Sequence, residues 1–177
     1  MKTLKLLIPP ASLSVVENAL QETFQTTAIQ DIDLLTGGLS ASTVYKIRVN
    51  ETPYVLKIGR SSGNMEIAAQ AGIAPPVYYL NMAAGVAITG FIESPPQQTV
   101  SPTKIARTIK RIHALPSFPD GNNLVNTVDG FIAQFNGPSL KDCLTYYAEI
   151  RKHYPWEDTD RVSSHNDLNP GNIICNG

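Results

Sequence analysis

The stretch His165-Asn166-Asp167-Leu168-Asn169-Pro170-Gly171-Asn172 lies near the end of the 177-residue chain and carries most of its chemical information. It places a carboxylate five positions before a carboxamide, with a histidine two positions before the carboxylate. Phosphoryl transfer uses such a pair, because an aspartate orients the attacking hydroxyl while a nearby asparagine oxygen holds magnesium against the nucleotide phosphates. Taken alone, the stretch also fits a polar turn whose Asn and Asp side chains bond to their own backbone.

These residue types suggest a division of roles within the motif. Asp167 is predicted to be the catalytic base, or the group that orients the acceptor hydroxyl. Asn172 is predicted to be a magnesium ligand, since this hard cation takes oxygen donors and keeps several waters. We place His165 beside Asp167 in the catalytic group, as a scaffold whose ring nitrogens hold the loop.

Composition narrows the class of protein. Hydrophobic residues make up 42% of the chain and charged residues 16%, which is typical of a globular protein with an apolar core. The apolar runs are shorter than a membrane span or a signal peptide requires, so we expect a mature, cytoplasmic protein. A net charge of −1 gives no basic patch for nucleic acid. Cys143 and Cys175 form no metal-binding or disulfide pattern, which fits a reducing compartment.

The hydrophobic pattern changes near residue 93 and predicts an α+β fold. Before this point we expect an antiparallel sheet with helices, and after it the pattern turns helical, with a loop over 116–128. Ser12 is the expected cap of the first helix, and Gly72 is expected to end the helix that precedes it in the sequence. The expected helices are 12–24, 62–71, 102–115 and 139–153, and the expected strands are 32–35, 43–49, 54–58, 77–80 and 86–91.

Two upstream features fit phosphate binding. The pair Gly37-Gly38 lies between two expected strands, where backbone N–H groups can approach phosphate oxygens closely, although a plain hairpin turn gives the same pattern. Lys57 lies within an apolar strand, where burial is costly unless an anion pairs with the ammonium group. The alternative is that Lys57 points to solvent on the outer face of the sheet.

The motif HNDLNPGN resembles the catalytic loop His-x-Asp-x-x-x-x-Asn of protein-kinase-like phosphotransferases. Its residue sequence most resembles the loops of aminoglycoside phosphotransferases and of choline, ethanolamine and thiamine kinases. The segments 35–47, 72–78 and 109–115 resemble the glycine loop, the helix-to-strand junction and an early second-lobe helix of these kinases. The resemblance implies a two-lobe fold, with an N-lobe over 1–92 and a mostly helical, partial C-lobe over 93–177.

The resemblance also implies a nucleotide site. Lys57 would bind the α- and β-phosphates and would be held by Glu66 in the following helix, as in kinase-like sites. Backbone groups at the boundary between the lobes would read the adenine. The implied nucleotide-binding residues are Gly37, Gly38, Ser40, Ser42, Lys57, Glu66, Gly90, Phe91 and Ile92.

The implied activity is transfer of the γ-phosphoryl group of ATP, with magnesium, to a hydroxyl of a small-molecule acceptor. Such enzymes carry a second metal-binding aspartate after the loop, whereas Asn172 is followed here by Ile-Ile-Cys-Asn-Gly. We therefore expect a truncated kinase, slow or inactive as this chain. Its unpaired strand 173–175 is expected to cause aggregation or to pair with a second copy. The alternatives are a non-catalytic nucleotide-binding or interaction module, similar to a pseudokinase, and an unrelated α+β domain with an accidental motif.

Overall fold

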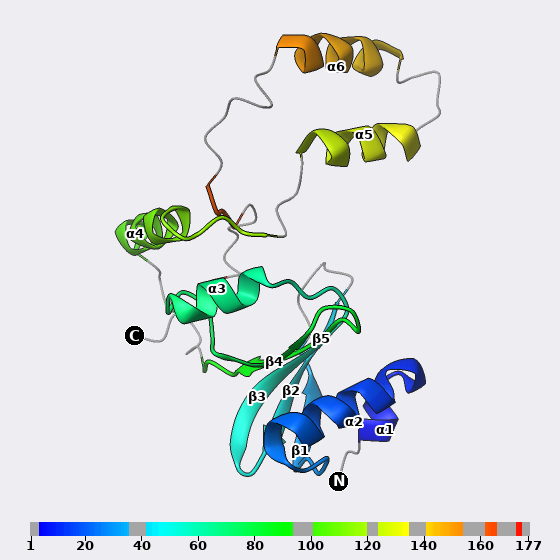
Figure 1. Ribbon diagram of the computed structural model, residues 1–177, viewed down its shortest axis with the longest axis vertical. Helices are drawn as coiled ribbons and strands as arrows, with labels where there is room; N and C mark the ends of the chain where they lie inside the picture. Colours follow the sequence, from blue (N-terminus) through cyan, green and yellow to red (C-terminus); the bar gives the residue numbers. More distant parts are fainter. Residues whose placement is uncertain are drawn as a thin grey trace.

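The structure is a computed structural model that describes residues 4–35, 42–93, 101–119, 124–134, 141–153, 162–165 and 173–174. The first part of the chain contains both helices and strands, and the elements that follow among the described residues are helices (Figure 1). The predicted α+β class is therefore confirmed. None of the helices in these residues is long and apolar enough to cross a membrane.

A five-stranded antiparallel sheet forms the centre of the first part. Its strands are β1 (Asp31–Leu34), β2 (Thr43–Val49), β3 (Thr52–Ile58), β4 (Val77–Asn81) and β5 (Val86–Gly90). They lie in the order β1-β2-β3-β5-β4, so β3 is the middle strand. The turn between β2 and β3 has only two residues, Asn50 and Glu51, with φ angles of 48° and 65°. Positive φ at both positions is the geometry that matches the twist of a tight hairpin.

Helices α1 (Leu4–Leu7) and α2 (Pro10–Phe24) cover one face of this sheet (Figure 1). The side chains of Tyr45, Ile47 and Val49 alternate along β2 and are buried against the helices, as a strand with one covered face requires. The Tyr45 hydroxyl donates a hydrogen bond to the Leu7 carbonyl oxygen at 2.8 Å, and burial raises the pKa of this tyrosine. The largest fully buried core side chains in the described part of the chain are Val16, Leu20, Ile32, Ile47, Val49, Leu56, Val86 and Ile88.

Local signals set the helix ends, not always where the sequence predicted. Helix α2 begins at Pro10, since proline is tolerated in a first turn, so the predicted cap at Ser12 is wrong and Ser12 lies inside the helix. Helix α3 (Asn64–Gln70) ends as predicted before Gly72, whose φ of 64° is the left-handed conformation favoured just after a helix. Helix α3 lies next to β4, away from α1 and α2 (Figure 1).

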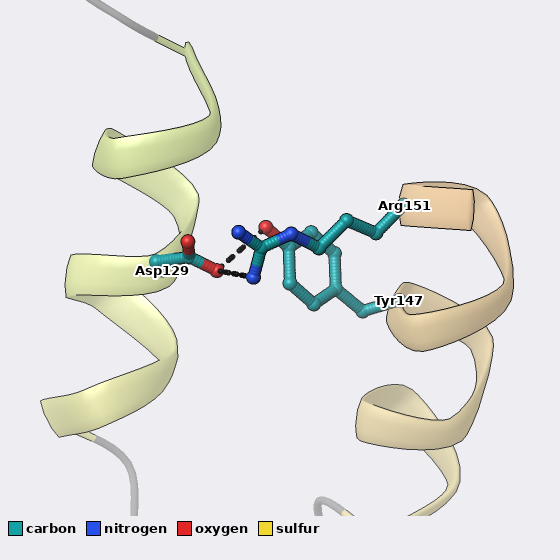
Figure 2. Close-up of polar contacts among 3 residues, drawn as sticks. All are labelled: Asp129, Tyr147 and Arg151. Carbon is teal, nitrogen blue, oxygen red and sulfur yellow. Dashed lines mark hydrogen bonds and ion pairs between the residues drawn. The ribbon is translucent and has the colours of Figure 1, made fainter. Parts of the chain in front are cut away.

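Three helices follow the sheet: α4 (Pro102–His113), α5 (Leu124–Gln134) and α6 (Lys141–His153). The predicted loop over 116–128 is wrong from residue 124 onward, because α5 begins there. Ile173 and Ile174 lie outside any strand, so the predicted strand is not formed by the two of its residues that the structure describes. Helices α5 and α6 lie side by side, joined by polar contacts of Asp129 (Figure 2).

Candidate functional site

The sheet has a second face, opposite the core that α1 and α2 cover, and Lys57 belongs to it. Side chains alternate along a strand, so the buried Leu56 faces the core and its neighbour Lys57 faces the other way. In the register of the sheet, Lys57 lies between Val44 on β2 and Ala87 on β5. The chain thus places one ammonium group on the middle strand, flanked by apolar residues.

Lys57 is partly removed from solvent. Desolvation lowers the pKa of its ammonium group below the ordinary value of 10.5, because the charged form loses hydration. Glu66 is exposed in the first turn of α3 and forms no ion pair with Lys57. Among the described residues, the ion pairs lie in the helical part of the chain, and none involves Lys57. The predicted Lys57–Glu66 pair is therefore absent from this structure.

Of the predicted phosphate-loop residues, the structure describes Ser42 alone. Gly37, Gly38 and Ser40 lie outside the described residues. Ser42 directly precedes β2 and lies against Gly59, which directly follows β3. Ser42 therefore lies beside the end of the strand that carries Lys57.

The predicted base-binding segment lies at the end of β5. The Gly90 amide donates to the Pro76 carbonyl oxygen at 2.9 Å, and a side chain at Gly90 would meet the Pro76 ring at 3.2 Å. The Gly90 N–H is thus already used within the protein. Phe91, the next residue, lies beneath the Lys46 ammonium group, which is 4.0 Å from the ring centroid.

Sequence reasoning missed two residues in this region. Lys46 lies two positions after Val44, so strand alternation alone places it on the second face with Lys57. Its contact with Phe91 is a cation–π interaction, typically about 0.5–1 kcal/mol at exposed sites. Ser61 follows Gly59 by two positions, and its hydroxyl oxygen is buried without a hydrogen-bond partner among the described residues. No sequence signal marks that hydroxyl, because its burial comes from the fold.

Ser163 lies two residues before the HNDLNPGN motif and forms hydrogen bonds with the turn after α4. This side chain is buried, and its hydroxyl donates to the Pro116 carbonyl oxygen at 2.7 Å and accepts from the Phe118 amide at 3.1 Å. His165, two residues later, is exposed. Asp167 and Asn172 lie outside the described residues, so their predicted roles stay predictions. Within the described part of the chain, no cluster of three or more His, Cys, Asp or Glu residues could hold a metal ion.

Comparison with known proteins identifies the class of fold. No protein-family model and no curated protein matches the chain. Solved structures do match, among them a choline kinase and a protein of the choline/ethanolamine kinase family. The expected resemblance to these kinases is therefore confirmed as a shared fold.

The individual matches are extensive in structure and low in sequence identity. Choline kinase LicA from Streptococcus pneumoniae superposes with a TM-score of 0.66 at 18% identity, over 90% of this chain and 64% of that chain. LicA in complex with AMP gives 0.60 at 15% identity, over 88% and 61%. The choline/ethanolamine kinase family protein from Mesorhizobium loti gives 0.52 at 18% identity, over 80% and 53%. The chain thus spans less than two thirds of the length of each of these structures.

Proposed function

We propose that this chain carries the nucleotide site and catalytic loop of an ATP-dependent small-molecule kinase. The observation that carries the proposal is the position of Lys57. Its partly desolvated ammonium group belongs to the middle strand of the sheet and to the face opposite the core. In this proposal residues 1–92 form the N-lobe and residues 93–177 the helical C-lobe of a kinase-like fold. The acceptor is a small molecule with a hydroxyl group, of the choline, ethanolamine, thiamine or aminoglycoside type.

The electrostatics of Lys57 favour an anionic ligand. Desolvation disfavours its charge, and the described residues supply no carboxylate to compensate it. Phosphate oxygens close to the ammonium group would restore the lost interaction and raise its pKa again. Ser42 and the segment containing Gly37, Gly38 and Ser40 would add hydrogen-bond donors to the same phosphates.

The base would lie against residues 90–92. Because the Gly90 amide already donates to Pro76, the backbone donors for adenine would come from Phe91 and Ile92. The structure of LicA with AMP supports a nucleotide at this fold, since that protein binds an adenine nucleotide. The Lys46–Phe91 contact would hold the aromatic ring beside this segment.

The chemistry would come from the HNDLNPGN motif. Asp167 would orient the acceptor hydroxyl and accept its proton, with His165 holding the loop. Asn172 would supply an oxygen ligand to magnesium, which when bound neutralises charge on the transferred phosphoryl group. Ser163 supports this segment from the Pro116–Phe118 turn.

Nucleotide binding tests the proposal directly. Displacement of a fluorescent ATP analogue by ATP should give a measurable dissociation constant for the wild-type chain. Lys57→Ala should weaken ATP binding by about tenfold or more, in line with loss of a charge-assisted contact of about 1.5–3 kcal/mol. Lys110→Ala is the matched control, because Lys110 is exposed on α4. A wild-type chain that binds no ATP, or a Lys57→Ala variant that binds it normally, contradicts the proposal.

The same geometry also suits a non-catalytic nucleotide-binding module. Lys57, Ser42 and residues 90–92 all belong to the nucleotide side of the site, and none of them would touch the acceptor. ADP release should be measured with choline, ethanolamine, thiamine and an aminoglycoside, for the wild type and for Asp167→Asn. Acceptor-dependent ADP release that Asp167→Asn abolishes supports the kinase. Binding of ATP without turnover for any acceptor supports the module.

A further inference from the structure

Three residues lie side by side at one end of the sheet, directly beyond the paired residues of β2, β3 and β5. They are Ser42, Gly59 and Gly85. The register pairs Thr43 with Ile58 and Ile58 with Val86, so these three residues form the next row beyond the ladder. The Gly59 amide continues the hydrogen bonding by donating to the Gly85 carbonyl oxygen at 2.8 Å. We call this row the glycine junction.

The backbones in the glycine junction approach too closely for side chains at the two glycines. A Cβ atom at Gly59 would lie 2.8 Å from both the Cα and the Oγ of Ser42. A Cβ atom at Gly85 would overlap the Gly59 carbonyl oxygen. Their φ angles of 131° and 66° are also conformations that glycine adopts at low cost and other residues do not. The close approach of the three strands therefore depends on both glycines.

The glycine junction connects two parts of the proposed nucleotide site. Ser42 is where the segment after Gly37-Gly38 rejoins the sheet, and Lys57 lies two residues before Gly59 on β3. Two residues of strand correspond to about 7 Å. The junction thus places Ser42 a short distance along the sheet from Lys57.

We propose that Gly59 and Gly85 are positioning residues for phosphate binding, which hold Ser42 in register with Lys57. The inference rests on the proposed nucleotide site and adds what sets its geometry. A Cβ atom at either glycine would push the strands apart and move the phosphate donors away from Lys57. A misplacement of about 1 Å is enough to cost a large factor in a site that depends on alignment. The proposed contacts of the base, at residues 90–92, involve no residue of the glycine junction.

The experiment compares ATP with adenosine, because only ATP uses the phosphate donors. Dissociation constants for both ligands are measured by displacement, for the wild type, Gly59→Ala and Gly85→Ala. We expect ATP affinity to fall by about tenfold or more while adenosine affinity changes by less than about twofold. A purely structural role for the glycines would instead weaken both ligands equally, and that result overturns the inference.

Gly72→Ala is the matched control. Gly72 also has a positive φ, of 64°, but a Cβ atom there would meet nothing within 4 Å. The variant therefore carries similar backbone strain away from the glycine junction, and its ratio of ATP to adenosine affinity should equal that of the wild type. A ratio that falls in Gly72→Ala as it does in Gly59→Ala counts against the proposal.

A second pair of variants tests the junction through Ser42 and needs no strained backbone. Ser42→Ala and Ser42→Gly both remove the hydroxyl, but only Ser42→Gly also removes the Cβ atom, which lies 3.0 Å from the position that a Cβ atom at Gly59 would take. We expect a lower ratio of ATP to adenosine affinity in Ser42→Gly than in Ser42→Ala, and equal ratios contradict the inference even where the glycine variants fail to fold. If ATP binding is sensitive to Lys57→Ala but not to any junction variant, this inference fails alone. If the wild type binds no ATP, the proposed function fails with it.

Discussion

The Ser163 hydroxyl donates a hydrogen bond to the Pro116 carbonyl oxygen at 2.7 Å, across 47 positions of sequence. The same hydroxyl accepts from the Phe118 amide at 3.1 Å, so one buried side chain satisfies two backbone groups. Ser163 lies two residues before His165, where the HNDLNPGN motif begins, and Pro116 follows α4. The turn after α4 therefore supports the chain immediately before the predicted catalytic loop.

Ser163→Ala is expected to lower the free energy of unfolding by about 1–2 kcal/mol, since two hydrogen bonds of ordinary strength are lost together. Urea denaturation followed by circular dichroism gives this value. Thr108→Ala is the control, because the exposed Thr108 hydroxyl donates only to the Lys104 carbonyl oxygen within α4. Its effect should stay within about 0.5 kcal/mol. Equal losses of unfolding free energy in the two variants would show that the Ser163 hydrogen bonds stabilise the protein no more than an exposed one does.

The affinity for ATP should depend on the ionisation of Lys57. Desolvation lowers the pKa of this lysine, so the charge that attracts phosphate is complete below the folded pKa and is lost as pH rises through it. The wild type should therefore bind ATP progressively less well as pH rises through this lowered pKa, which lies below the ordinary value of 10.5. Lys57→Arg keeps its charge over this range and should show a flatter profile. Parallel profiles for the two proteins would assign the pH dependence to other groups.

The same lowered pKa makes a prediction about stability. Below the folded pKa of Lys57, the charged side chain opposes folding, and this penalty disappears as pH rises toward the unfolded value. Lys57→Met removes the charge and keeps an unbranched apolar chain of similar length. It should raise the melting temperature at neutral pH while it abolishes tight ATP binding. A lower melting temperature would show that Lys57 is stabilised by a partner in the folded protein.

The contact between α5 and α6 depends on Asp129, which accepts hydrogen bonds from Tyr147 at 2.8 Å and from Arg151 at 3.1 Å (Figure 2). The pKa of Tyr147 is raised above its ordinary value of 10.0. Desolvation is the largest cause, and the hydrogen bond to Asp129 and the negative charge of Asp129 add to it. Asp129→Asn should therefore lower this pKa. Ultraviolet titration of tyrosinate reads the change, and subtraction of the Tyr147→Phe titration isolates one tyrosine among the seven in the chain. An unchanged Tyr147 titration would mean that the two helices are not joined in solution.

Gly130→Ala should stabilise the protein. Gly130 lies inside α5, and a Cβ atom there would meet nothing within 4 Å. Alanine in an unobstructed helix interior is favoured over glycine by about 0.5–1 kcal/mol, because it loses less backbone freedom on folding. The free energy of unfolding in urea measures the gain. Gly72→Ala should change it in the opposite direction, since Gly72 has a φ of 64°.

Much of the sheet could be predicted because alternation along a strand is a local property. The range predicted for β2, 43–49, is confirmed, and the buried Tyr45, Ile47 and Val49 alternate in it with Lys46 and Arg48. Helix α5 was missed. Val125, Val128 and Ile132 recur near helical spacing, but Gly130 and the polar residues before 124 resemble a loop. A helix of this kind is stabilised by its surroundings more than by its own propensity.

The sequence by itself determined which residues are candidates for the chemistry and which side of a strand they face. Alternation places Lys57 and Lys46 opposite the core, and the spacing of Asp167 and Asn172 marks the predicted catalytic loop. Only the tertiary structure decided which distant residues meet: Ser163 with Pro116, Gly59 with Gly85, and Lys46 with Phe91. It also left Lys57 apart from Glu66. The physical reason is that local periodicity fixes the direction of a side chain, whereas strand order and helix docking fix its neighbours.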